Sequence, residues 1–429
     1  MTIRNNYKKT PINLIPIDWD IKRLGSLGKT FTGLSGKNKD DFGEGFQYIP
    51  YKNIFQNSII DISFMDLVKI KPNETQSKVK YGDLFFTTSS ETAEEVGMCS
   101  VLLEEVENMY LNSFCFGFRF DDFEILDPRF SSYLFRGEQI RQEITVLAQG
   151  STRFNLSKSQ LQKLKIPIPP LPEQQKIASI LATWDNAIDV TKKILSNLEI
   201  IKKGMTINVL SGKIRFETFL KENKISQRNG YKIPDDWEIK NLSSVLEQVK
   251  KPIKPEKDIL YKQLGIRSHT KGIFYKESVT GQSLGNKSVF AIEPDCFILN
   301  IVFAWEHAIA KTSIAELDMI VSHRFPMYKP LPTKLDLDYL LFFFKSKKGK
   351  DLLGLASPGG AGRNKTLGQK EFLKLKIPIP SIKEQKAIAI FLETYDSEIK
   401  LHLQKLQTLQ LQKKGLMQQL LTGKIRVKN

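Results

Sequence analysis

Two short acidic segments contain the residue types that a metal-dependent nuclease uses. Asp18 and Asp20 are followed by Lys22 in the first segment, and Asp235 and Glu238 are followed by Lys240 in the second. Paired carboxylates can hold a divalent cation that activates a water molecule. Two residues or fewer separate the paired acids, which is too close for side chains carried on separate strands. The spacing therefore favours a strand entry anchored by Trp19 and Trp237 over a catalytic centre.

Other residues that could bind a metal or cofactor are also poorly placed. His269, His307, His323 and His402 lack the spacing of metal ligands. The segment GKT at Gly28–Thr30 would need a glycine at position 23 to form a phosphate-binding loop, and that residue is Arg23. An adenine methyltransferase would need an Asn/Asp-Pro-Pro-aromatic motif, whereas the Pro-Pro pair here, Pro169–Pro170, lies in a connector. We therefore expect no catalytic site, metal or cofactor on this chain.

The composition indicates a multidomain protein with a polyanionic partner. The chain has 429 residues, and 64 basic minus 47 acidic residues give a net charge of +17. Residues 1–170 hold 21 basic and 21 acidic residues and are neutral, so any DNA binding there must use a local patch or the help of a partner. The longest apolar runs are far shorter than the ~20 residues of a membrane span. Cys99, Cys115 and Cys296 form no CxxC pair, which fits a reducing cytosol.

An internal duplication organises the sequence. LKIPIPPLPEQQKIASILATWDNAI at Leu164–Ile188 and LKIPIPSIKEQKAIAIFLETYDSEI at Leu375–Ile399 are identical at 14 of 25 positions, with an offset of 211 and no gap. SGKIRF at Ser211–Phe216 and TGKIRV at Thr422–Val427 continue the same offset. IPIDWDIKRL at Ile15–Leu24 and IPDDWEIKNL at Ile233–Leu242 open the two halves. The middles of the halves differ, so one frame is used twice with different contents.

Each repeated segment predicts a long helix with a heptad seam. Apolar residues recur at alternating steps of four and three in the same register in both copies; the seam comprises Ile177, Leu181, Trp184, Ile188, Leu195, Leu198 and, in the second copy, Ile388, Leu392, Tyr395, Ile399, Leu406, Leu409. The polar interruptions Thr191/His402 and Lys202/Lys413 also coincide. Gly212 and Gly423 stand where left-handed C-terminal caps are expected. Two such helices can bury their seams on each other as an antiparallel pair. The alternative is an ordinary core helix in each domain.

The segments before the helices predict mixed domains that are richer in strand than in helix. Strands are expected at Phe46–Ile54, Asp83–Thr88, Phe114–Phe120, Cys296–Phe303 and Ile320–Tyr328, and a single helix near Phe130–Leu147 and near Leu337–Leu353. Glycine-bearing basic loops follow at Gly150–Ser157 and Gly359–Leu367. The expected organisation is a first domain of residues 1–170, a helix of residues 171–215 and a linker of residues 216–232. A second domain of residues 233–380 and a helix of residues 381–429 follow.

Two variable domains, each followed by a PIP-x3-EQ helix that ends in [ST]GKIR, resemble the specificity subunit of type I restriction–modification enzymes. The resemblance covers nearly the whole chain. It implies an α+β fold in which two target recognition domains with twisted sheets are joined by two long antiparallel coiled-coil helices, with a pseudo-twofold internal repeat. It also implies a non-catalytic, sequence-specific DNA-binding subunit of a prokaryotic, cytoplasmic complex that methylates DNA and defends against phage.

The same resemblance implies partners and their cofactors. Two methylation subunits would bring S-adenosylmethionine, and restriction subunits would bring ATP, Mg and the nuclease. Each recognition domain would read one half of a gapped, two-part DNA site, with the paired helices as spacer and platform. The alternatives are the same reader in a methylase-only complex, a stand-alone nuclease that uses the acidic segments, and a scaffold that reads no sequence.

Several loops combine flexible backbone with the side chains that read bases or phosphates. Arg153 and Arg363/Lys365 lie on the glycine loops; Gly33–Lys39 and Tyr51–Asn53 are the further candidates of the first domain, and Arg267–Lys271 and Trp305–His307 those of the second. The candidate DNA-contacting residues are Lys37, Lys39, Lys52, Asn53, Arg153, Arg267, His269, Lys271, Trp305, His307, Arg363 and Lys365. Each stretch could instead be an ordinary surface turn.

Overall fold

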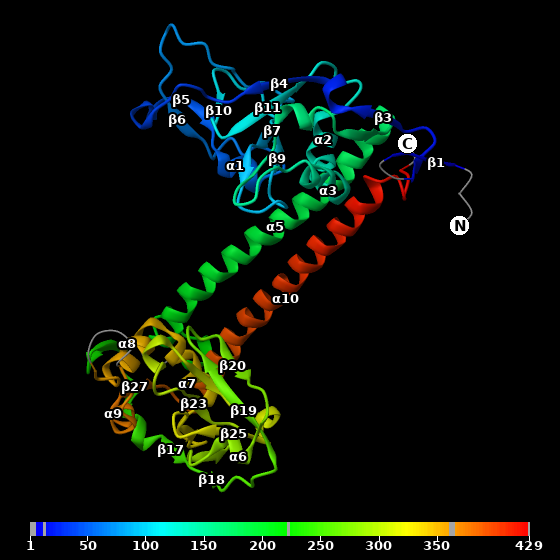
Figure 1. Ribbon diagram of the computed structural model, residues 1–429. Coiled ribbons are helices and arrows are strands. Elements are labelled where there is room, and N and C mark those ends of the chain that lie inside the picture. Colours follow the sequence, from blue (N-terminus) through cyan, green and yellow to red (C-terminus); the bar gives the residue numbers. More distant parts are fainter. Residues whose placement is uncertain (1–5, 12–13, 221–223, 360–364, 428–429) are drawn as a thin grey trace. The chain divides into compact units, whose positions relative to one another are not determined.

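The computed structural model describes residues 6–11, 14–220, 224–359 and 365–427. The chain forms two compact units, residues 1–192 with 404–429 and residues 193–403. Two long helices, α5 (Leu171–Leu210) and α10 (Ile382–Leu420), each contribute one half to each unit (Figure 1).

The first unit carries two main sheets beside the start of α5 and the end of α10. A four-stranded antiparallel sheet has the order β4-β11-β7-β9, and a three-stranded sheet has the order β10-β5-β6 with β10 and β5 parallel. The strands are β1 (Tyr7–Lys9), β2 (Leu14–Pro16), β3 (Asp20–Arg23), β4 (Gly28–Thr32), β5 (Phe42–Ile49), β6 (Asp66–Val68), β7 (Leu84–Thr87), β8 (Ser89–Ser90), β9 (Cys99–Val101), β10 (Tyr110–Leu111), β11 (Cys115–Phe120), β12 (Phe154–Asn155) and β13 (Lys165–Ile168). The short helices are α1 (Tyr51–Gln56), α2 (Pro128–Leu134), α3 (Glu138–Val146) and α4 (Lys158–Leu161).

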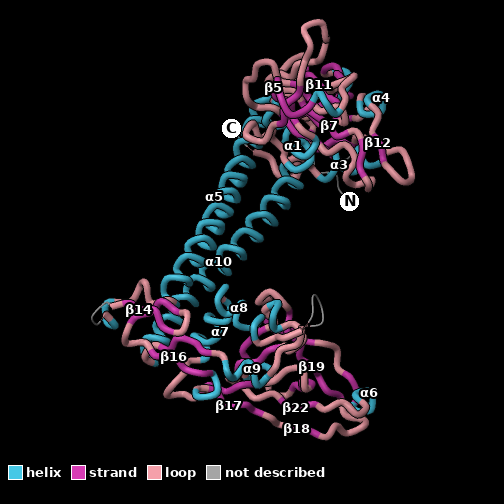
Figure 2. Tube along the Cα trace, turned by 90° about the vertical axis from the view of Figure 1, so that its left-hand side faces the viewer, coloured by secondary structure: helices cyan, strands magenta, loops and turns pink. Residues whose placement is uncertain are grey.

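The second unit contains an antiparallel sheet of order β17-β26-β23-β24 and a sheet of order β18-β22-β25-β19-β20, with β21 also on β19. Figure 2 shows the strands β17, β18, β19 and β22 of this unit. The strands are β14 (Ile225–Arg228), β15 (Tyr231–Pro234), β16 (Glu238–Asn241), β17 (Leu246–Val249), β18 (Pro252–Ile253), β19 (Leu260–Arg267), β20 (Gly272–Tyr275), β21 (Val279–Thr280), β22 (Val289–Ala291), β23 (Phe297–Leu299), β24 (Ile309–Lys311), β25 (Met319–Ser322), β26 (Met327–Pro330) and β27 (Lys376–Ile379). Its helices are α6 (Gly281–Leu284), α7 (Leu337–Lys345), α8 (Lys347–Leu355) and α9 (Gln369–Lys374).

The strand orders show that the duplication extends through the middles of the two halves, which differ in sequence. The sheet β4-β11-β7-β9 has the order of β17-β26-β23-β24, and both are antiparallel throughout. The trio β10-β5-β6 matches β25-β19-β20, and each trio contains one parallel and one antiparallel pairing. Strand pairing depends on which positions are buried and not on their identity, so it survives divergence that hides the repeat in the sequence.

Some of the expected elements differ from those in the structure. The expected strand Phe46–Ile54 ends at Ile49, because Pro50 is the N-cap of α1. The expected helices Phe130–Leu147 and Leu337–Leu353 are each two helices, which are separated at Gly137 and at Ser346, the N-caps of α3 and α8. The expected linker 216–232 contains the first strand of the β14–β15 hairpin, the counterpart of the β1–β2 hairpin.

The long helices follow the repeated sequence and run antiparallel. The Lys413 ammonium pairs with Asp185 in the first unit, and the Lys202 ammonium pairs with Asp396 in the second. The two pairs are 17 residues apart on both helices (185 to 202 and 396 to 413), so the helices pair in the same register within each unit. These lysines are the polar interruptions of the seam, and their partners lie on the facing helix.

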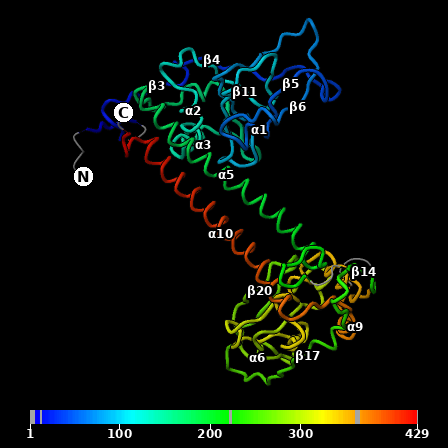
Figure 3. Tube along the Cα trace, turned by 180° about the vertical axis from the view of Figure 1, so that it is seen from behind, coloured from blue at the N-terminus to red at the C-terminus, as the bar shows by residue number. Residues whose placement is uncertain are grey.

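The seam residues are buried to different degrees. Ile177, Leu181, Ile188, Leu195, Ile388 and Leu392 are buried, while Trp184, Leu198, Tyr395, Ile399, Leu406 and Leu409 are half-buried. Ile177 and Leu181 belong to the core of the first unit, and Ile388 and Leu392 to the core of the second. The start of each helix is therefore part of a domain core. Figure 3 shows the two long helices side by side.

The Glu of each repeated EQ joins the start of one long helix to the end of the other. In the first unit, the guanidinium of Arg426 donates to Glu173 at 2.8 and 2.9 Å and to Asp18 at 2.9 and 2.6 Å, and the Trp19 indole N–H donates to Glu173 at 2.9 Å. In the second unit, Arg215 donates in the same way to Glu384 and Asp236, and Trp237 donates to Glu384 at 3.2 Å. We call these groups the first clamp (Asp18, Trp19, Glu173, Arg426) and the second clamp (Asp236, Trp237, Glu384, Arg215).

The Gln of each EQ fixes the short helix that packs beside the long one. Gln174 accepts from the backbone N–H of Asp127, the N-cap of α2, and donates to the Pro169 carbonyl at 2.9 Å. Gln385 accepts from the N–H of Asp336, the N-cap of α7, and donates to the Pro380 carbonyl at 2.9 Å. Both glutamines are fully buried, so every polar contact here replaces a lost contact with water.

The glycine caps after the long helices pack against the segments that carry the clamp tryptophans. Gly212 and Gly423 have φ of 68° and 67°. A Cβ on Gly212 would lie 2.4 Å from Pro234, and one on Gly423 would lie 2.5 Å from Pro16. Both positions therefore need glycine for their backbone conformation and for the close approach to the Pro that precedes each clamp tryptophan.

We expect Arg215→Met to destabilise the protein more than Arg426→Met. The Arg215 side chain is 2% exposed and that of Glu384 is 2% exposed, whereas Arg426 is 35% exposed. Removing one partner of a buried pair costs about 3–5 kcal/mol, and water can partly replace Arg426. Urea unfolding of the full chain measures the difference, with the exposed neighbours Lys213→Met and Lys424→Met as controls. Equal losses in the two arginine variants would contradict the interpretation.

Candidate nucleic-acid interface

Three loops of the second unit meet beside the ends of β19 and β23. The His269 N–H donates to the Glu306 carbonyl at 2.7 Å, and the Thr270 N–H donates to the His307 carbonyl at 3.0 Å. The Leu367 N–H donates to the Ile301 carbonyl at 2.8 Å, which brings in the segment before α9. We call Ser268–Lys271, Phe303–His307 and Lys365–Leu367 the second loop cluster.

The first unit brings three segments together at the corresponding strands. The Tyr51 hydroxyl donates to the Ser89 carbonyl at 2.8 Å, Phe154 pairs with Ser90, and the Leu156 N–H donates to the Thr88 carbonyl at 2.9 Å. We call the first turn of α1 (Tyr51–Asn53) and the segments Ser89–Gly97 and Gly150–Phe154 the first loop cluster. Burial raises the pKa of Tyr51, and the positive charge of Arg153 is one of the influences that oppose the rise.

The two loop clusters correspond element by element. In each unit one segment follows a strand that has a parallel neighbour, β5 or β19. A second segment follows β7 or β23, which are inner strands of the four-stranded sheets. The third segment precedes a short helix, α4 or α9. Leu156 and Leu367, which are related by the offset of 211, make the equivalent backbone contacts. The clusters thus occupy equivalent positions but differ in almost every side chain.

Most predicted cationic residues are exposed. Lys39, Lys52 and Arg153 are exposed in the first unit, and Arg267, His269 and Lys271 are exposed in the second. The Arg267 guanidinium lies over the Phe274 ring at 5.2 Å and so is held without an acidic partner at that face. Apart from Lys39, these residues lie in or directly beside the loop clusters.

Two predicted residues have structural roles instead. The side chain of Asn53 is fully buried; its amide donates to the Asp61 and Phe64 carbonyls at 2.8 Å and its oxygen accepts from the Asp61 N–H. The Lys37 side chain is 3% exposed and pairs with Glu74 at 2.5 Å. This pairing is the largest of the influences that lower the pKa of Glu74 to about 2. We therefore leave Asn53 and Lys37 out of the proposed DNA-contacting set.

Trp305, His307 and Lys365 are the remaining predicted residues of the second unit that the structure describes. Trp305 is half-buried, and the Lys365 ammonium lies 5.5 Å from its ring centre. His307 is buried, and burial, with smaller contributions from the charges of Lys350 and His269, lowers its pKa to about 4. Its Nε2 has no hydrogen-bond partner among the residues that the structure describes. Arg363 lies outside the described residues.

Sequence reasoning did not identify the residues that support these loops. Arg136 donates to the carbonyls of Cys99, Ile54, Phe55 and Asn57, and Arg141 donates to those of Gly97, Glu94 and Val96. No local pattern indicates a buried arginine that binds carbonyl oxygens. The exposed acids Glu91, Glu94 and Glu95 of the first loop cluster were also missed, although an acidic run between two strands was a visible signal.

The acidic segments do not form a catalytic centre in the structure. Asp18 and Asp236 belong to the clamps, and the Asp235 carboxylate accepts from the Ser226 hydroxyl. Within the described ranges, no group of three or more His, Cys, Asp and Glu side chains could hold a metal ion. A search of the same residues also found no helix that is both long and apolar enough to span a membrane.

Comparison with known proteins assigns the family. The profile of the type I restriction modification DNA specificity domain matches residues 16–200 and 234–411. A putative type I restriction enzyme MjaX specificity subunit of Methanocaldococcus jannaschii is 27% identical over 440 residues, which cover 99% of this chain and 97% of the relative. The MjaVIII specificity subunit of the same organism is 25% identical over 450 residues, with the same coverage.

A solved structure has the same fold. The S subunit of a type I restriction–modification system from M. genitalium matches with a TM-score of 0.55 at 14% identity, over 98% of both chains. This likeness confirms the expected fold class: an α+β protein with two sheet-rich domains, two long antiparallel helices and an internal repeat. Because the family profile matches both halves of the duplication, the chain belongs to the type I restriction–modification DNA specificity family and is a specificity subunit of such a system.

Proposed function

We propose that the two domains read the two halves of a gapped DNA site, one domain to each half. Residues 1–170 and 233–380 are the target recognition domains, and the helices of 171–215 and 381–429 separate them, with 216–232 as the connection. The observation that carries this proposal is the pair of loop clusters. They stand at equivalent positions on equivalent strands and present different side chains. Equivalent geometry with different chemistry is what two different half-sites require.

The side chains of the loop clusters suit DNA in different ways. Lys52, Arg153, Arg267, Lys271 and Lys365 supply cations for phosphates or guanine edges, and His269 and Trp305 supply an imidazole and a ring. The acids Glu91, Glu94 and Glu95 of the first loop cluster can accept from the amino group of cytosine. The neutral balance of residues 1–170 fits a reader whose base contacts include carboxylates.

The long helices are the proposed platform for two methylation subunits. Ile200, Ile201, Ile207, Leu401 and Leu403 of the second unit, and Val190 and Leu411 of the first, are exposed apolar side chains between 46 and 70% accessible. We take these exposed aliphatic side chains of the long helices as the candidate contacts for a protein partner. The partners carry S-adenosylmethionine, and restriction subunits with ATP and Mg complete the complex in the cytoplasm. This chain itself is the non-catalytic subunit.

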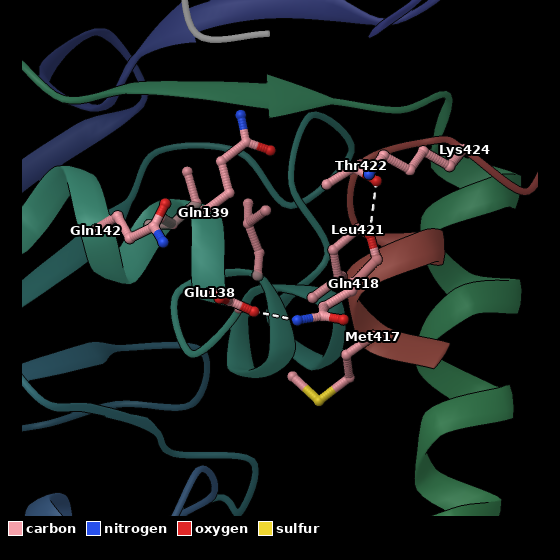
Figure 4. Close-up of a pocket in the computed structure, with 11 residues that line it drawn as sticks. Glu138, Gln139, Gln142, Met417, Gln418, Leu421, Thr422 and Lys424 are labelled. Carbon is pink, nitrogen blue, oxygen red and sulfur yellow. Dashed lines mark hydrogen bonds between the residues drawn. The ribbon is translucent and has the colours of Figure 1, made fainter. Parts of the chain in front are cut away.

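Equivalent pockets beside the two long helices would meet these partners. The first unit has a pocket of about 310 Å³ between α2, α3 and the end of α10, and it is lined by polar residues such as Glu138, Gln139 and Gln418 (Figure 4). The second unit has one of about 420 Å³ between α7, α8 and the end of α5, lined by Ile207, Leu210, Tyr231 and Phe343. The second pocket is therefore the stronger site for an apolar side chain of a partner.

Arg153→Ala should weaken DNA binding of the reconstituted complex for all sequences. If Arg153 contacts one phosphate, the slope of log affinity against log salt should fall by about one unit. Titrations at several salt concentrations measure this slope, and the exposed Lys163→Ala is the control. An unchanged slope together with altered base preference would show that Arg153 reads a base.

Inserting seven helical residues after Lys193 and seven after Gln404 should lengthen the gap between the half-sites. Both ion pairs are kept, because each insertion lies between them on its own helix. One heptad adds about 10.5 Å, or roughly three base pairs at ~3.4 Å each, and DNA can absorb part of this by bending. Mapping of methylated adenines should give a gap one to three base pairs wider with the same bases. A change in the bases read would contradict the division between readers and spacer.

Ile207→Glu should reduce co-purification of the methylation subunit that is expressed with this chain. Ile207 is 59% exposed, so the folded chain tolerates the charge, whereas a buried interface does not. Ile314→Glu is the matched control, because Ile314 is 78% exposed and lies away from the long helices. Full recovery of the subunit with Ile207→Glu, or an equal loss with Ile314→Glu, would place the platform elsewhere.

A further inference from the structure

The turn between β19 and β20 has an unfavourable backbone for its residues. The Lys271 N–H donates to the Ser268 carbonyl at 3.4 Å and closes a tight turn. The two central residues of this turn, His269 and Thr270, have φ of 60° and 58°. Hairpin turns with two positive φ values strongly prefer Asn-Gly, because side chains, and β-branched ones above all, are strained there.

A two-residue turn of the same chain uses the preferred residues, whereas the β19–β20 connection spans four residues between the paired Arg267 and Gly272. The hairpin β14–β15 is closed by Asn229 and Gly230, with φ of 48° and 79°, between the paired residues Arg228 and Tyr231. The preferred residues are thus used at one hairpin and not at the other. The hairpin fold alone does not account for His269 and Thr270.

The strain is concentrated in the second loop cluster. Among the described residues, six that are not glycine have positive φ: Asn108, Asn229, His269, Thr270, Asp295 and His307. The Asn and Asp members tolerate this conformation. The other three lie in the second loop cluster; histidine also tolerates this conformation, so the β-branched Thr270 is the strained residue among them.

The residues of this cluster with positive φ hold one another in place. The backbone N–H groups of His269 and Thr270 donate to the carbonyls of Glu306 and His307, and the Ser268 hydroxyl donates to the Glu306 carboxylate at 3.0 Å. His307 lies two residues before β24 with φ of 64°, and the residue two before β9 in the first unit is Gly97 with φ of 61°. A Cβ on Gly97 would lie 2.5 Å from Leu156, so the first unit has no room for the side chain that the second unit carries.

The turn also faces a cationic surface. His269 is exposed between the exposed Arg267 and Lys271. Thr270 lines a pocket of about 580 Å³ in which Lys203, Lys345 and Lys347 outnumber the acid Glu199, while Lys202 and Asp396 pair with each other. Strained residues that the surrounding structure holds fixed are concentrated at binding sites, where a fixed shape is part of the function.

We propose that the turn Ser268–Lys271, held by Glu306 and His307, is a pre-shaped base-reading element for the half-site of the second domain. His269 contacts a purine edge through its ring nitrogens, and Thr270 contacts a neighbouring base through its hydroxyl or methyl group. Arg267 and Lys271 hold the flanking phosphates. The inference rests on the proposed DNA-reading function and assigns the residues that discriminate bases.

Exchanging the two turns tests the proposal in the complex with its methylation subunits. His269→Asn with Thr270→Gly gives the strained turn its preferred residues, so Tm should stay unchanged or rise. Discrimination in one half-site of the methylated motif should fall by about tenfold or more, and the other half-site should keep its bases. Asn229→His with Gly230→Thr is the reciprocal control, for which we expect a lower Tm and an unchanged motif.

The outcomes separate this inference from the proposed function. If wild-type complex methylates no two-part motif, the proposed function fails. Suppose that the wild-type complex does methylate a two-part motif. If the His269/Thr270 variant then keeps its selectivity, or loses it only together with stability, the turn has a structural role. In that case the inference fails and the proposed function stands.

Discussion

A buried carboxylate at the start of each long helix is the constraint on which the rest of the structure depends. Glu173 and Glu384 are 5% and 2% exposed, and a buried charge needs a charged partner with well-aligned hydrogen bonds. In both units the partner is an arginine that follows the end of the other long helix. Neither helix can therefore be placed without the other, and the antiparallel arrangement, the glycine caps and the buried tryptophans follow from this requirement.

The residues of this arrangement were largely visible in the sequence, although their roles were not. The duplicated EQ, GKIR and IP-x-DW motifs predicted two equivalent helices with capped ends, because their spacing is exact and ungapped. The contacts Glu173–Arg426 and Glu384–Arg215 join residues 253 and 169 positions apart, and no local pattern indicates such partners. The acids at Asp18 and Asp235 looked like possible metal ligands, whereas Asp18 and the neighbouring Asp236 bind arginines.

The domains were harder to predict for a different reason. The orders of the four-stranded sheet and of one strand trio are the same in both domains, yet the sequence suggested dissimilar middles, because a sheet needs only an alternation of buried and exposed positions. Within the candidate interface, exposed cations such as Arg153 and Arg267 could be proposed from residue type and loop context. The burial of Asn53 and Lys37 depends on Asp61, Phe64 and Glu74, which lie on neighbouring loops. Residue type alone cannot distinguish a loop residue that reads DNA from one that holds a loop together.

The first and second clamps are completed in a defined order while the chain is being synthesised. During synthesis the partner of Glu173 emerges 253 residues after it, whereas the second clamp is complete once Glu384 follows Arg215 by 169 residues. Domains generally fold as they leave the ribosome, the N-terminal one first. Here the domain that is made first keeps Glu173 with Trp19 but without its arginine partner until the second clamp has been made. The second clamp is therefore completed before the first. The first domain can complete its own clamp only after Arg426 has been synthesised.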